Sequence, residues 1–106
     1  MNETRAPKAQ TMFIVLLKFS NAKDRARELI AEHNAWIQRG FDAGAFLLVG
    51  SIQPGLGGAI LAANGPRADL EARIREDPFI VHDVVKAELL EVSPSRAHPQ
   101  LASLFV

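Results

Sequence analysis

The first strong structural signal in the chain is an apolar segment that reads Met12-Phe-Ile-Val-Leu-Leu-Lys-Phe19. It is rich in β-forming residues, and Lys18 is its single charged side chain. Such a segment predicts a central strand that is covered on both faces, or on one face by the chain itself and on the other by a partner. The preceding residues, 1–11, show no periodicity, and we expect them to form a mobile N-terminal arm.

A long amphipathic helix is predicted directly after this strand, from Asp24 to about Ala43. Gly40 and Gly44 are typical of its end. The apolar stripe that we expect to face the sheet has three- and four-residue spacings and consists of Ala26, Leu29, Ile30, His33, Ile37 and Phe41.

Two strands joined by a short turn come next. Ala45–Ile52 and Gly58–Ala63 are both apolar and flank Gln53-Pro54-Gly55, where Pro and Gly occupy the positions that a type II turn favours. The three segments together predict a β-hairpin.

The last part of the domain is predicted to add a helix and a strand. Arg67–Glu76 has the pattern of a short helix, a further helical turn is expected at Phe79–Val84, and Val85–Val92 alternates like a strand. The tail, 95–106, carries apolar residues at helical spacing, and we expect it to dock rather than to be mobile, with a partner subunit as one candidate surface.

The predicted order β-α-β-β-α-β is that of a ferredoxin-like α+β domain, which we place at residues 12–94. Both helices then cover one face of an antiparallel sheet, and the other face is bare in a monomer. Because the strands are apolar on both sides, this bare face predicts an interface, and hence a homodimer or a higher oligomer.

Composition excludes several classes of protein. The chain has 106 residues, 12 basic and 12 acidic side chains and no cysteine. The balanced charge argues against nucleic-acid binding, and the lack of cysteine rules out a disulfide scaffold, a thiolate metal site and a cysteine nucleophile. No apolar run reaches the ~20 residues of a membrane span and no signal-peptide pattern is present, so we expect a cytoplasmic protein that binds no membrane.

Two residues are the chief candidates for chemistry. His33 lies on the apolar stripe of the long helix, and Asp77 precedes Pro78 after the second helix. Each has a purely structural interpretation: a core histidine bonded to a backbone carbonyl, and an N-cap for the next helical turn. In the predicted topology the two helices are neighbours, so the carboxylate could orient the imidazole as an acid or base. The three histidines lack metal-ligand spacing, and we expect neither a metal site nor a cofactor.

The chain resembles the YciI-like (YCII-related) family. The resemblance rests on His33-Asn-Ala-Trp36, Gly50, Gly57-Gly58 and Asp77-Pro78-Phe79 in this order, and it covers about Met12 to Pro94. It implies a dimeric α/β barrel with a cleft that contains a His-Asp pair, here His33 and Asp77. Many relatives have Gly-Pro where this chain has Gly50-Ser51, and often an Arg shortly before the histidine, where this chain has Leu29 and Ile30. The second difference suggests a more apolar pocket.

Two functions remain open at this point. The first is a small cofactor-independent enzyme that uses His33 and Asp77 for elimination, isomerisation or hydrolysis on a small cyclic or aromatic molecule. The second is a non-catalytic ligand-binding or assembly module, in which the pair is a structural hydrogen bond. A haem-linked or monooxygenase barrel is a weaker third. The expected substrate-binding residues are Trp36, Phe46, Leu48, Gly50, Ser51 and Phe79.

Overall fold

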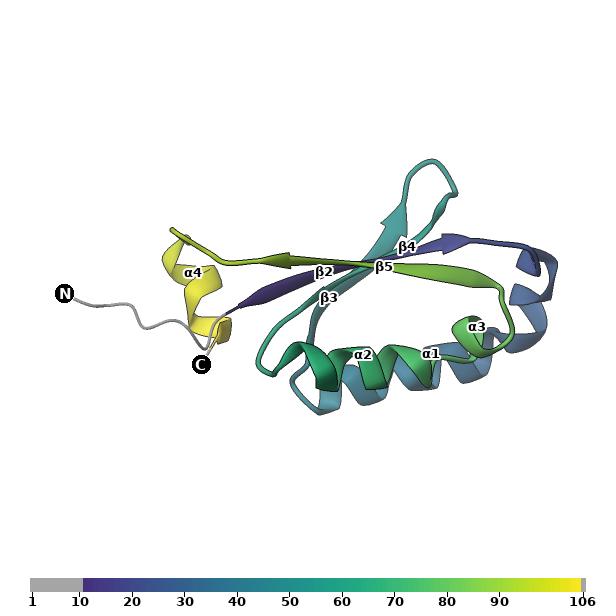
Figure 1. Ribbon diagram of the computed structural model, residues 1–106, viewed down its shortest axis with the longest axis horizontal. Helices are drawn as coiled ribbons and strands as arrows, with labels where there is room; N and C mark the ends of the chain where they lie inside the picture. The colour runs from purple at the N-terminus through teal and green to yellow at the C-terminus, as the bar shows by residue number, and fades with distance from the viewer. Residues whose placement is uncertain (1–10, 106) are drawn as a thin grey trace.

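The computed structural model describes residues 11–105, so the predicted arm lies outside the described residues except for Thr11. One antiparallel sheet in the order β3-β4-β2-β5 forms the centre of the domain (Figure 1). Its strands are β2 (Met12–Phe19), β3 (Phe46–Ile52), β4 (Gly57–Ala62) and β5 (Val85–Val92). This connectivity confirms the ferredoxin-like α+β fold.

The helices of the domain lie on one side of the sheet, as predicted (Figure 1). They are α1 (Ala26–Asp42), α2 (Arg67–Arg75) and the four-residue α3 (Pro78–Val81), with a 3-10 turn η2 (Lys23–Arg25) before α1. Among the described residues no helix is both long enough and apolar enough to span a membrane.

The alternation of β2 separates the core from the opposite face of the sheet. Phe13, Val15 and Leu17 are buried beneath the helices, and Val15 pairs with Ile60 of β4 on one side and with Leu89 of β5 on the other. The side chains between them point to the open face. That face carries half-buried or exposed apolar residues from all four strands: Met12, Ile14, Leu16, Leu48, Ile52, Leu61, Leu90 and Val92.

The buried stripe of α1 differs from the predicted one. Leu29, His33, Trp36 and Gly40 are buried, whereas Ile30 and Phe41 are exposed. The predicted stripe combined two neighbouring helix faces, because spacings of three and four residues connect both of them.

Gly40 has a packing function rather than the helix-ending role predicted for it. It lies inside α1, and a Cβ atom at this position would overlap the ring of Phe46. Gly44, with a φ of 73°, follows the end of α1 as predicted. In the hairpin turn Gly55 has the expected positive φ of 64°, but the Gln53–Pro54 peptide bond is cis, unlike that of the predicted turn.

The tail forms a helical turn, α4 (Pro99–Ala102), followed by a 3-10 turn, η3 (Ser103–Phe105). Both lie beyond one end of the sheet, away from α3 (Figure 1). The Asn64 side-chain amide donates to the carbonyls of Gly44 and Leu104, at 3.2 Å and 3.1 Å, and so connects the tail to the loop after α1. Within one chain, Asn64 thus holds the tail, and docking on a partner subunit stays a prediction.

Candidate active site

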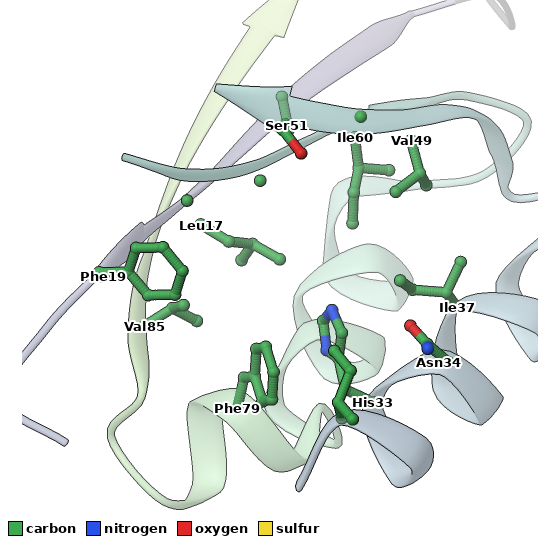
Figure 2. A pocket seen from close by; sticks show the side chains of 15 residues that line it. Leu17, Phe19, His33, Asn34, Ile37, Val49, Ser51, Ile60, Phe79 and Val85 are labelled. Atoms are coloured by element: carbon green, nitrogen blue, oxygen red, sulfur yellow. The ribbon is translucent and has the colours of Figure 1, made fainter. Parts of the chain in front are cut away.

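A cavity of about 270 Å³ lies between α1, α3 and the helix-covered face of the sheet (Figure 2). Its apolar walls come from β2, from both strands of the hairpin, from α1 and from the beginning of β5. His33 and Phe79 form the side nearest to α3. The volume is at the lower end of the range for small-molecule sites, which favours a compact ligand.

His33 and Asp77 are in direct contact at the edge of this cavity. His33 Nδ1 lies 2.7 Å from Asp77 Oδ1, and the two residues are 9 % and 0 % exposed. Because a carboxylate oxygen accepts, this bond places the proton of the neutral imidazole on Nδ1 and leaves Nε2 without one. Figure 2 shows the distal ring nitrogen pointing into the cavity. This is the geometry that a general base requires.

Asp77 is placed by the start of α3. It is the N-cap residue, and its Oδ1 accepts the backbone N–H of Phe79 at 3.0 Å, while Pro78 occupies the first helical position. The same Oδ1 therefore serves both the helix and His33. A carboxylate has a second oxygen that could have taken one of these roles. Instead, Oδ2 is buried with no hydrogen-bond partner among the described residues.

Aromatic rings hold the imidazole of His33. The Phe79 ring stacks on it with a centroid distance of 3.9 Å and an interplanar angle of 4°, and the Trp36 ring lies 5.7 Å away. Phe79 thus contacts the pair twice, since its backbone N–H binds Asp77 and its ring covers His33. Together with the hydrogen bond, these contacts fix both the tautomer and the plane of the ring.

The structure brings three of the six predicted substrate-binding residues to the cavity. Gly50, Ser51 and Phe79 line it. Trp36 and Phe46 lie in the closed core, where their rings meet edge to face and the Trp36 indole N–H donates to the Arg73 carbonyl at 2.9 Å.

Leu48 lies outside the cavity, on the opposite face of the sheet, where it is 57 % exposed. A shift of register between Phe46 and Leu48 is the cause. Phe46 pairs with Ala62, whereas Leu48 pairs with Leu61, the next residue of β4. In a regular strand residues two apart share a face, and a bulge removes this relation.

A second stripe of α1 contributes one wall of the cavity, and its polar member was not among the predicted site residues. Ile30, Asn34 and Ile37 line the cavity and stand beside the buried stripe. Ile30 and Ile37 belong to the apolar stripe predicted for this helix, whereas Asn34 is the polar residue between them at i, i+4, i+7 spacing. Because a polar side chain interrupts an apolar pattern, periodicity alone gives no signal for Asn34.

The remaining histidines lie elsewhere, on the surface. His82 is exposed and its Nδ1 accepts from Arg25 Nη1 at 3.4 Å. His98 caps α4 by accepting the Gln100 backbone N–H at 3.1 Å. Within residues 11–105 no group of three or more His, Cys, Asp or Glu side chains could hold a metal ion.

Comparisons with known proteins show a likeness of fold. No family model matches the chain, and no curated protein matches it in sequence. The crystal structure of MtbAldR is similar with a TM-score of 0.59 and 11 % identity, covering 93 % of this chain and 63 % of that chain. A mutant of SnoaB, a cofactor-independent oxygenase from Streptomyces nogalater, has a TM-score of 0.46 and 10 % identity, covering 86 % of this chain and 98 % of SnoaB.

At such identities the likeness extends to the fold alone, and this chain spans less than two thirds of MtbAldR. The fold shared with MtbAldR is the ferredoxin-like α+β unit. Membership of the YciI-like family therefore stays a prediction from the sequence.

Proposed function

We propose that the chain is a small cofactor-independent enzyme in which His33 is the general acid or base and Asp77 orients it. The observation that carries the proposal is the 2.7 Å bond between Nδ1 and Asp77 Oδ1, with Nε2 directed into a cavity. A base must lie where a substrate atom can reach it, and a partner on its other nitrogen keeps the reactive nitrogen unprotonated.

The chemistry that suits this site is proton transfer at a small cyclic or aromatic molecule. In an elimination, Nε2 takes a proton from one ring carbon, and the electrons of that C–H bond form a double bond to the next carbon. The leaving group departs from that carbon with its own bonding pair. In an isomerisation, the imidazolium returns the proton to another atom of the same substrate. In the elimination, the imidazolium releases its proton to the departing group or to water, so both reactions return His33 to its starting state.

The experiment is a turnover screen on lactones, cyclic enones and chlorinated phenols with the wild type and three variants. His33→Ala and Asp77→Asn should lower kcat/KM by about 100-fold or more, as expected for the loss of an acid/base group. The matched control is His82→Ala, which removes an exposed imidazole outside the cavity and should leave turnover unchanged. Equal turnover in all four proteins would exclude the pair from the mechanism.

A non-catalytic ligand-binding or assembly module is the second candidate, and one observation favours it. Asp77 Oδ1 stabilises α3 and His33 simultaneously, so the pair has a structural use without any reaction. This function predicts that His33→Ala lowers the melting temperature strongly, and that no substrate of the screen is turned over by the wild type.

The further expectations from the sequence belong to the same proposal. We propose membership of the YciI-like family, a homodimer formed through the open sheet face, and a cytoplasmic location. Support for the dimer comes from the apolar side chains that all four strands place on that face.

A further inference from the structure

The walls of the cavity carry no formal charge. Of the described side chains that line it, His33 is the one with a titratable group, and none is Asp, Glu, Lys or Arg. The charged side chain directly behind the wall is Asp77, which contacts His33. While Asp77 is ionised, the pair has a net charge of zero or minus one, depending on the imidazole. The site thus offers no excess positive charge to a ligand.

Two uncharged polar side chains face the cavity in addition to His33. Asn34 projects from α1 beside the imidazole, and Ser51 projects from β3 with its hydroxyl turned inward (Figure 2). Both are exposed, and none of the side-chain hydrogen bonds among the described residues involves either of them. Their donors and acceptors are therefore available to a ligand.

We propose that Asn34 and Ser51 select a neutral ligand, by holding a carbonyl or hydroxyl group while an apolar body enters against Leu17 and Ile60. This inference rests on the proposed function, because it names the substrate class of the same cavity. Asn34 and His33 line the same part of the cavity (Figure 2), so a group held by the Asn34 amide would lie near the imidazole. An amide N–H placed there polarises a substrate carbonyl and makes the neighbouring C–H more acidic.

The same walls reject anions of similar shape. A carboxylate that enters an apolar cavity loses its water and finds neither Arg nor Lys to replace it. An amide of the same size keeps its hydrogen bonds with Asn34 and Ser51 and carries no charge to desolvate. Selectivity should therefore follow charge among ligands of equal shape.

Benzamide and benzoate are suitable probes, because they differ in charge and hardly in size. Trp36 is the only tryptophan of the chain and lies 5.7 Å from the His33 ring, so its fluorescence reports binding in the cavity. We expect the wild type to bind benzamide at least tenfold more tightly than benzoate. Equal dissociation constants, or no binding of benzamide, would overturn the proposal.

Two variants test the assigned residues, and a third is their control. Asn34→Leu keeps the approximate volume and should weaken benzamide binding by about 3- to 10-fold, the range for one lost hydrogen bond. Ser51→Ala should do the same to a smaller extent. The control is Gln38→Leu, the same kind of change at an amide that binds Asp42 and does not line the cavity.

The result of this binding experiment can be distinguished from the result of the turnover screen. If Asn34→Leu weakens binding no more than Gln38→Leu, the assignment of Asn34 is wrong, whatever His33 does in catalysis. If the binding pattern is as expected but no substrate is turned over, the cavity is a selective binding site and the enzyme proposal fails. Circular dichroism on each variant establishes that the fold is retained.

Discussion

His33 and Asp77 are buried polar residues in a domain with a small core, and their contacts offset part of the cost of burial. Burial of an unpaired polar group costs about 1–3 kcal/mol, and more for a charged one. Nδ1 and Oδ1 satisfy each other, and the Phe79 N–H adds a second bond to Oδ1. Removal of either partner leaves the other one buried and unpaired, so the two residues should depend strongly on each other.

This dependence can be measured with a double-mutant cycle. We expect His33→Ala and Asp77→Ala to show a coupling of about 1–3 kcal/mol in the free energy of unfolding, because the partners are in contact and buried. Denaturant unfolding of the two single variants and the double variant gives the value.

The control cycle uses Lys18 and Glu88, which are 3.7 Å apart and both 56 % exposed in their side chains. Exposed ion pairs contribute about 0.2–1 kcal/mol, so this coupling should be the smaller one. Additive effects at His33 and Asp77 would contradict the bond between them.

Gly40 is a second position at which one atom decides stability. A Cβ atom there would overlap the Phe46 ring, so Gly40→Ala should destabilise the domain by about 1–3 kcal/mol, although alanine is the better helix former. Thermal and denaturant unfolding measure the change. Gly65→Ala is the matched control, since no atom lies within 4 Å of its added Cβ and its φ is not positive. A Gly40→Ala variant as stable as the control would show that Phe46 can move aside.

Among the helices and strands, the sequence was sufficient to predict where each element lies in the chain. It was not sufficient to predict which side chains of each element point to the core. Strand β5 was predicted at its observed bounds, and helix α1 within a few residues of its ends, because each has a clear period. The bulge between Phe46 and Leu48 reversed the face of Leu48, and no pattern in a short apolar strand reveals such an insertion.

In the candidate site, the pair His33 and Asp77 was predictable from the sequence, whereas the arrangement of the cavity walls was not. The proximity of His33 and Asp77 follows from topology, since neighbouring helices bring their residues together. Periodicity alone does not decide which face of α1 meets the sheet and which lines the cavity. The close packing of Gly40 against Phe46 of β3, a contact between two separate elements, is one constraint on that face.

The tail elements α4 and η3 depend on one loop side chain. Asn64 has a φ of 67° and bonds the carbonyls of Gly44 and Leu104. Asn64→Gly keeps this backbone conformation without strain and removes both bonds. We expect hydrogen exchange of the α4 and η3 amides to accelerate at least tenfold, while exchange in β2 and β4 stays unchanged. Unchanged exchange in the tail would show that other contacts hold it.

For the complete chain, the open sheet face is the feature that most needs a partner. Leu61 is half-buried near its centre, where it pairs with Ile14 and Leu48. If two copies pack through this face, Leu61→Asp buries an unpaired charge in the interface and should yield single chains. Light scattering should give the mass of two chains for the wild type.

Ala72→Asp is the control for this prediction. It adds the same charge at an exposed position of α2, on the helix side of the domain, and should remain a dimer. A wild-type protein with the mass of one chain would contradict the proposed dimer.

The double use of Asp77 Oδ1 links the His33 imidazole to the cooperative unfolding of the domain. Helix α3 has four residues and cannot persist alone, so its cap, the stacked Phe79 ring and the oriented His33 should form or dissolve together. We therefore expect no partly melted form in which this imidazole is displaced and the rest of the domain is intact. If His33 acts as proposed, heat inactivation and loss of the fold should occur as one event, at one temperature.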